Sequence, residues 1–160
     1  MITIELADTE ATEKLGAHLF QCLPTQCLVF LHGDLGMGKT TLVRGFLHAA
    51  GHVGVVKSPT YNIVEEYSVQ ARQVLHFDLY RIVDPEELEW LGMRDYLAQN
   101  CCSFIEWPVR GEGYLPQPDM EIYLRPQSTG RIAELILLNA ELFSSAADEA
   151  GGIKLEDFQP

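Results

Sequence analysis

A glycine-rich segment near the N-terminus has the composition of a phosphate-binding loop. Residues 33–40 read GDLGMGKT and match the pattern G-x-x-x-x-G-K-[ST]. In such a loop the glycines let backbone N–H groups approach phosphates, and the following helix points its positive end at the same anion. Lys39 is expected to reach the β- and γ-phosphates, and the Thr40 hydroxyl is expected to bind Mg²⁺. The predicted nucleotide-binding residues of the loop are Gly33, Leu35, Gly36, Met37, Gly38, Lys39, Thr40 and Thr41.

Two carboxylates further along the chain are candidates for the acid that a P-loop enzyme uses beside its metal. Glu106 ends the apolar run 103–105, which has the form of the strand that neighbours the loop strand. Asp78 lies in the segment HFDLYR, where strand alternation places His76, Asp78 and Tyr80 on one face. Both acids are therefore candidate catalytic residues.

The two acids are expected to divide the chemistry, with Glu106 on the metal and Asp78 on water or the hydration shell of the metal. Each has an alternative interpretation that stays open. Asp78 is then a structural carboxylate paired with Arg81 or His76, and Glu106 is a solvated strand end.

Hydrophobic patterning indicates the elements that must position these residues. Residues 27–32 (CLVFLH) form a continuous apolar run, which is typical of a central strand covered on both faces. A helix over 40–50 follows the loop, and an earlier helix is capped by Asp8 or Thr9 and ends at Pro24. The other expected elements are a helix that starts at Asp84 and strands over 2–6, 61–69, 73–80, 103–107, 120–124 and 131–138.

This order of elements predicts an α/β protein with the P-loop NTPase fold. Helices are expected to form outer layers on both faces of a mixed, mainly parallel central sheet, a three-layer α/β/α arrangement. Strands 61–69 and 73–80 are expected to form a β-hairpin at this sheet. A single ATPase domain is expected over residues 1–143, followed by a polar, acidic and partly disordered tail over 144–160.

Composition excludes several classes of protein. Of the 160 residues, 23 are acidic and 11 are basic, which gives a formal net charge of −12 and argues against direct nucleic-acid binding. The uncharged stretch 15–33 has Pro24 in its middle, so it predicts a helix end and a strand rather than a membrane span. Without a secretory signal the protein is expected in the cytoplasm, where its four cysteines stay free thiols.

Several segments together resemble the TsaE (YjeE) family of small P-loop ATPases. They are GDLGMGKTT at 33–41, KSPTY at 57–61, HFDLYR at 76–81, DPEEL at 84–88, GMRDY at 92–96 and IEW at 105–107. The order and spacing of these segments match over residues 30–110, and the combination is far more specific than the loop alone. Met37 departs from the usual alanine at a tolerant position.

The resemblance implies a weak, partner-dependent ATPase that uses ATP and Mg²⁺. Its implied partners are the TsaD and TsaB proteins. The implied product is threonylcarbamoyladenosine at position 37 of tRNAs that read codons beginning with A. Contact with tRNA is expected only indirectly, through the complex, and no membrane is involved.

Residue roles are implied by the same resemblance. Thr40 and Glu106 are implied Mg²⁺ ligands, and Asp78 is implied to support hydrolysis. Trp107 is implied to belong to the same site, the alternative being a packed core indole. The implied switch-like loop near the γ-phosphate consists of Ser58, Thr60 and Tyr61.

Adenine recognition is the least defined part of the predicted site. The chain is too short for a separate base-binding domain, so the base is expected against the first strand–helix junction or the late strands. The candidates are Thr9 at the helix cap and Arg131 in a Gly-Arg-Ile segment similar to that of the family. In the alternative, Thr9 is a plain cap and Arg131 is a solvated arginine.

Three other functions use the same loop. A small-molecule kinase needs several arginines on a lid, and the 110–118 region carries only Arg110. A GTPase needs Asn-Lys-x-Asp to read guanine, and the sequence lacks it. A nucleotide-dependent binding partner without turnover shares all of these residues, and only a measurement of phosphate release separates it from an ATPase.

Overall fold

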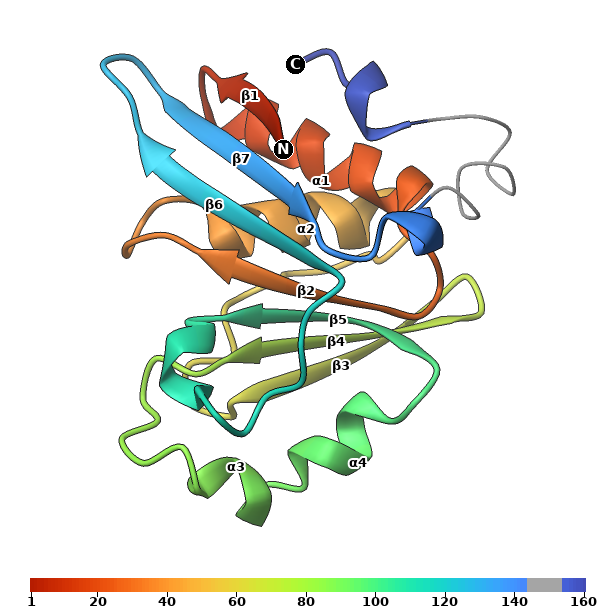
Figure 1. Cartoon of the computed structure of the whole chain (residues 1–160). Coiled ribbons are helices and arrows are strands. Elements are labelled where there is room, and N and C mark those ends of the chain that lie inside the picture. Colours follow the sequence, from red (N-terminus) through yellow and green to blue (C-terminus); the bar gives the residue numbers. More distant parts are fainter. Residues whose placement is uncertain (144–153) are drawn as a thin grey trace.

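The described residues form one mixed β-sheet with the strand order β1-β7-β6-β2-β5-β4-β3 (Figure 1). The computed structural model describes residues 1–143 and 154–160. The strands are β1 (Ile2–Leu6), β2 (Cys27–His32), β3 (Val64–Val69), β4 (Arg72–Asp78), β5 (Cys101–Glu106), β6 (Met120–Pro126) and β7 (Arg131–Leu137). Strands β6, β2, β5 and β4 pair in parallel. Strand β3 joins β4 as the expected antiparallel hairpin, and β7 lies antiparallel between β1 and β6.

Helices cover the two faces of the sheet unequally (Figure 1). Helices α1 (Thr9–Cys22) and α2 (Lys39–Ala49) pack on one face and bury the larger cluster of apolar side chains. The short helices α3 (Glu87–Trp90) and α4 (Met93–Leu97) contribute to a second apolar cluster with β4, β5 and part of β2. The predicted three-layer α/β/α arrangement is confirmed, although the helical layer formed by α3 and α4 is thin. None of the described helices is long and apolar enough to cross a membrane.

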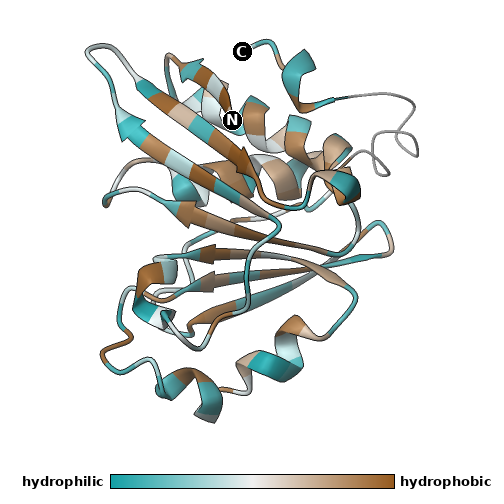
Figure 2. Cartoon of the chain, viewed as in Figure 1, coloured by the Kyte–Doolittle hydropathy of each residue, from teal (hydrophilic) through white to brown (hydrophobic). Residues whose placement is uncertain are grey.

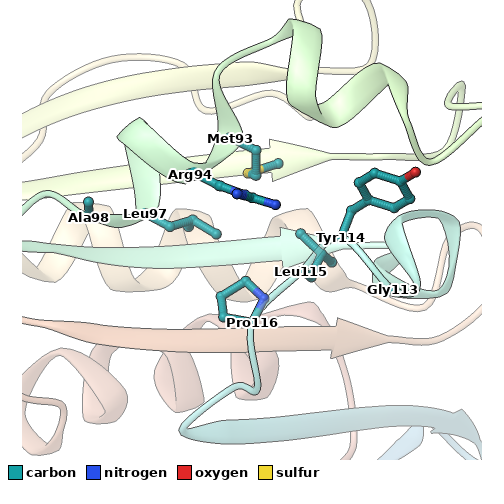
Figure 3. A pocket seen from close by; sticks show the side chains of 8 residues that line it. All are labelled: Met93, Arg94, Leu97, Ala98, Gly113, Tyr114, Leu115 and Pro116. Atoms are coloured by element: carbon teal, nitrogen blue, oxygen red, sulfur yellow. The ribbon is translucent and has the colours of Figure 1, made fainter.

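Strand hydropathy follows this layering (Figure 2). Strands β2 and β5 are apolar along most of their length because side chains on both faces are covered. Strand β6 instead alternates between buried and partly exposed residues, since helices cover only one of its faces. A cavity of about 410 Å³ lies on the side of the sheet that carries α3 and α4, between α4 and the segment 113–116 (Figure 3).

Two glycines bring the backbones of α1 and α2 into close contact. A Cβ atom added to Gly16 would lie 2.1 Å from the carbonyl oxygen of Leu42. One added to Gly45 would lie 2.1 Å from the carbonyl oxygen of Glu13. Neither position therefore accepts a larger residue unless the two helices move apart.

We expect Gly45→Ala to lower the free energy of unfolding by about 1–3 kcal/mol, because the added methyl group overpacks the α1–α2 contact. Urea unfolding followed by circular dichroism measures this change. Ala49→Ser, at an exposed position of the same helix, is the matched control and is expected to change stability by less than about 0.5 kcal/mol. A Gly45→Ala variant as stable as the control would contradict the close packing of the two helices.

The start of α3 differs from the expectation. The α-helix begins at Glu87 rather than directly after Asp84. The Asp84 carboxylate accepts a hydrogen bond from the N–H of Glu86 at 3.0 Å, and the Glu87 carboxylate accepts one from the N–H of Asp84 at 2.9 Å. Asp84 thus binds a free N–H group as expected, but it caps a turn that leads into a very short helix.

The last described residues return to α1. The tail contains a 3₁₀ turn, η2 (Leu155–Asp157), whose Leu155 is buried in the larger apolar cluster. The ring nitrogen Nε2 of His18 lies 2.8 Å from the carbonyl oxygen of Lys154, and the ring of Phe158 packs on His18. The expectation of disorder over 144–160 includes residues 144–153, which lie outside the described residues. The proposed domain extent, 1–143, stays a prediction.

Candidate functional site

The glycine-rich loop connects β2 to α2 at the carboxyl ends of the parallel strands. Gly36 and Gly38 have φ angles of 79° and 98°, a left-handed conformation that glycine adopts readily. A Cβ on Gly38 would also lie 2.2 Å from the Nη1 atom of Arg131. The curvature of the loop, and with it the position of the first turn of α2, depends on these glycines.

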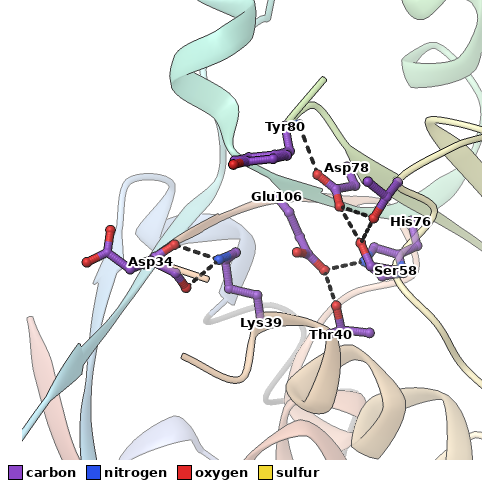
Figure 4. A network of polar contacts seen from close by, with 10 residues as sticks. Asp34, Lys39, Thr40, Ser58, His76, Asp78, Tyr80 and Glu106 are labelled. Carbon is purple, nitrogen blue, oxygen red and sulfur yellow. Dashed lines mark hydrogen bonds and ion pairs between the residues drawn. The ribbon is translucent and has the colours of Figure 1, made fainter. Parts of the chain in front are cut away.

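Lys39 is held inside the loop, with 4% of its surface exposed. Its Nζ atom donates hydrogen bonds to the carbonyl oxygens of Gly33 at 2.5 Å and Asp34 at 2.9 Å (Figure 4). Burial lowers the pKa of Lys39, although the nearby carboxylates act in the opposite direction. A buried ammonium group bound to neutral carbonyl oxygens is well placed to receive an anion.

The two candidate acids lie side by side at one edge of the sheet. Asp78 ends β4 and pairs in register with Glu106, which ends β5. Glu106 in turn pairs with Leu31 of β2, the strand that leads into the loop. The two acidic residues are almost fully buried, with 4% of Asp78 and 3% of Glu106 exposed. The edge of the sheet where ligands bind in open α/β folds therefore carries both acids.

Glu106 is hydrogen-bonded to residues of two other elements. The Oγ1 atom of Thr40 donates to Oε1 of Glu106 at 2.8 Å, and Nε2 of His76 lies 2.8 Å from the same oxygen (Figure 4). The alternative in which Glu106 is a solvated strand end is therefore wrong.

A hydroxyl and a carboxylate oxygen in contact are donors of the kind that Mg²⁺ prefers, so Thr40 and Glu106 fit such an ion. Within residues 1–143 and 154–160, no group of three or more His, Cys, Asp or Glu side chains could hold a metal. A magnesium ion at this site would accordingly need phosphate or water oxygens as further ligands.

Asp78 is bound by the segment that precedes β3. Its Oδ2 atom accepts hydrogen bonds from the hydroxyl of Ser58 and from that of Thr60, the latter at 3.1 Å (Figure 4). Its Oδ1 atom accepts a hydrogen bond from the backbone N–H of Tyr80 at 2.9 Å. Two residues of the predicted switch-like loop thus contact the predicted catalytic acid.

The structure contradicts the alternative in which Asp78 pairs with His76 or Arg81. His76 is hydrogen-bonded to Glu106, and the guanidinium carbon of Arg81 lies 4.2 Å from the ring centroid of Tyr61. Tyr61 itself is 82% exposed, whereas Ser58 and Thr60 are partly buried.

A cleft of about 220 Å³ joins the loop to the two acids. Its lining residues are Leu35, Gly36, Gly38, Lys39, Thr40, Thr41, Ser58, Thr60, Asp78, Glu106 and Trp107. Segments far apart in the sequence therefore meet at one small site. The cavity beside α4 is separate, since it is lined by none of these residues.

Trp107 forms one wall of the cleft. Its backbone is left-handed, with φ 57°, which is unusual for a bulky residue. Its ring lies 4.5 Å from Nζ of Lys39 and 5.0 Å from the ring of Tyr80. Trp107 also packs on the second apolar cluster while it stays partly exposed, so it is more than a core indole.

The two adenine candidates lie outside this cleft. Thr9 is the exposed first residue of α1, and the cap of that helix is Asp8, whose carboxylate accepts a hydrogen bond from the N–H of Ala11 at 2.8 Å. Arg131 begins β7 and donates from Nη1 to the carbonyl oxygen of Met37, a residue of the loop, at 2.9 Å. The proposed contacts of Thr9 and Arg131 with adenine stay predictions.

His76 is the residue whose place in the site the sequence did not reveal. The alternation pattern put it on the same face as Asp78, but its hydrogen bond to Glu106 depends on how β4 and β5 pair. The available signal was the polar ring of His76 between apolar residues, in the part VLHF of the strand RQVLHFD.

A strand–loop–helix phosphate loop that faces two acids at adjacent strand ends defines a P-loop nucleotide-binding protein. The model of the family "Threonylcarbamoyl adenosine biosynthesis protein TsaE" matches residues 6–133. The chain belongs to the TsaE family.

Individual relatives agree with this assignment. The tRNA threonylcarbamoyladenosine biosynthesis protein TsaE of Haemophilus influenzae is 50% identical over 109 residues, which cover 68% of this chain and 69% of the relative. The protein of the same name from Bacillus subtilis is 36% identical over 123 residues, covering 77% of this chain and 75% of the relative. The crystal structure of YdiB from B. subtilis has the same fold, with a TM-score of 0.76 at 22% identity, over 94% of this chain and 93% of YdiB.

Proposed function

We propose that this protein binds ATP with Mg²⁺ and hydrolyses it slowly. In the proposal, it acts in the cytoplasm with TsaD and TsaB to form threonylcarbamoyladenosine at position 37 of tRNAs that read codons beginning with A. The observation that carries the ATPase part is the cleft in which Lys39 and Thr40 face Glu106 and Asp78. Membership of the TsaE family supports the part in tRNA modification.

In this proposal the residues of the cleft have separate roles. Lys39 exchanges its two carbonyl partners for the β- and γ-phosphate oxygens. Thr40 and Glu106 would hold Mg²⁺, which supplies positive charge next to the phosphate oxygens. Asp78 orients a water molecule whose oxygen bonds to the γ-phosphorus while the bond from that phosphorus to ADP breaks.

The hydrogen bonds of Asp78 support a slow basal rate. The hydroxyls of Ser58 and Thr60 occupy Oδ2 of Asp78, so this oxygen must be released or shared before it binds water. A partner that moves the segment holding Ser58 and Thr60 would free Asp78. This arrangement gives a physical reason for turnover that depends on TsaD and TsaB.

Contact with tRNA is assigned to the partners. A formal net charge of −12 repels phosphate backbones, and the eleven basic residues form no run in the sequence. The protein alone therefore lacks the positive charge that tRNA binding needs at physiological salt.

Phosphate release from ATP tests the proposal. We expect slow release by the purified protein with Mg²⁺, faster release when TsaD and TsaB are added, and none above background for Lys39→Ala in either condition. ATP binding without release in both conditions would contradict turnover and favour a nucleotide-dependent binding partner. Transfer of the γ-phosphate to a small molecule instead of water would favour a kinase.

A further inference from the structure

We propose that His76 is a positioning residue, which holds the Glu106 carboxylate in the orientation that meets Mg²⁺ together with Thr40. This inference rests on the proposed function, because it concerns the metal site described above. It assigns a role to a side chain that no phosphate or water in the cleft can reach.

His76 is buried more completely than either acid. Its exposed fraction is 0%, and its Nε2 atom lies 2.8 Å from Oε1 of Glu106. Its other ring nitrogen, Nδ1, is buried and has no hydrogen-bond partner within the described residues. An unpaired buried polar atom lowers stability, so an apolar side chain would serve the core better at this position. The contact that distinguishes His76 from an apolar residue is the hydrogen bond to Glu106.

The surroundings of the ring assign the direction of this hydrogen bond. Oε1 of Glu106 is a carboxylate oxygen and can only accept, so a hydrogen on Nε2 of His76 satisfies both atoms. The opposite tautomer would bring two lone pairs together and leave a buried N–H on Nδ1 without an acceptor. We therefore assign Nε2 as the donor.

The pairing of β4 with β5 fixes where this donor lies. His76 pairs with Phe104, and the next pair on the same face is Asp78 with Glu106, so His76 lies one step behind the acids, toward the interior of the sheet. It does not line the cleft. His76 can therefore act on the reaction only through Glu106.

Thr40 and His76 donate to the same oxygen of Glu106 from different elements (Figure 4). Thr40 comes from the first turn of α2, and His76 comes from β4. Two donors on one oxygen restrict the rotation of the carboxylate more than either does alone. When Thr40 turns toward a metal, His76 remains to hold Glu106 in place. Residues that orient a metal-binding side chain in this way commonly change metal affinity by about 10–100-fold when replaced.

The test compares His76→Leu with His76→Gln. Leucine fills the site without a donor, whereas the side-chain amide of glutamine can place an N–H near the position of Nε2. Binding of a fluorescent ATP analogue is titrated with and without Mg²⁺, and thermal unfolding shows whether each variant is folded. Affinity, not turnover, is the readout.

The quantity compared is the factor by which Mg²⁺ raises the affinity for the analogue. We expect this factor to be about 10–100-fold smaller in His76→Leu than in the wild-type protein, with the Mg²⁺-free affinity nearly unchanged. His76→Gln is expected to keep most of the gain. If His76→Leu does not fold, His76→Asn replaces it, because its shorter amide reaches the Nδ1 position and removes the donor from Glu106.

Two results would overturn the proposal while the proposed function stands. One is a full Mg²⁺-dependent gain in His76→Leu and His76→Asn. The other is an equal loss of affinity with and without Mg²⁺, which would show that His76 only supports the fold. If the wild-type protein binds the analogue without any effect of Mg²⁺, the proposed metal site fails, and the role of His76 fails with it.

Discussion

Lys39→Ala is expected to weaken nucleotide binding by at least about 100-fold and to abolish tRNA modification in cells that lack the native copy. Lys39 is the one basic side chain among the residues that line the cleft, and its amine is already positioned by the carbonyl oxygens of Gly33 and Asp34. Removing it leaves phosphate charges in a partly buried site whose lining no longer contains a basic side chain. Titration with a fluorescent ATP analogue measures the affinity.

Lys57→Ala is the matched control for this variant. Lys57 is exposed and does not line the cleft, although it lies in the same segment as Ser58 and Thr60. We expect its affinity for nucleotide to stay near that of the wild-type protein. Equal affinities in the Lys39 and Lys57 variants would refute the assignment of residues 33–41 as the phosphate site.

Asp78→Asn is expected to slow phosphate release in the presence of TsaD and TsaB by about 100-fold or more, while nucleotide affinity stays nearly intact. The physical reason is that Asp78 is proposed to act on the water of the transition state, whereas Glu106 contacts the predicted metal ligand Thr40. An interaction made mainly in the transition state lowers turnover without an equal loss of ground-state binding.

Glu106→Gln is the companion variant and is expected to weaken Mg²⁺-dependent binding of nucleotide. Both variants keep the volume of a buried side chain, so a difference between them reports on charge rather than on packing. Should Asp78→Asn lose nucleotide as severely as Glu106→Gln, the two acids do not divide the work in this way.

The local parts of this site could be predicted from the sequence. The run at 27–32, the glycines of the loop and the helix after it are determined by short-range patterns, and the structure places them as β2, the loop and α2. The acids Asp78 and Glu106 could also be selected, because each lies where an apolar strand ends.

The contacts between segments could not be predicted in the same way. The register between β4 and β5 is decided by packing of the whole sheet. The neighbours of His76 and Asp78 on β5 could therefore not be predicted from the sequence. The same limit applies to Arg131, whose contact with the carbonyl oxygen of Met37 joins residues 94 positions apart. The start of α3 was predicted too early in the sequence. Asp84 and Glu87 both accept hydrogen bonds from backbone N–H groups here, whereas a single cap residue was expected.

Arg131 supports the phosphate loop from a strand far along the chain. Its guanidinium group is bound to the backbone of the phosphate loop at Met37 and leaves no space for a Cβ atom on Gly38. This contact supports the loop from outside the cleft, whose lining includes Lys39, Ser58 and Thr60 but not Arg131. The segment that restrains Asp78 therefore also lies beside the proposed phosphate site. A partner seated on that segment would control product residence time as well as the hydrolytic step.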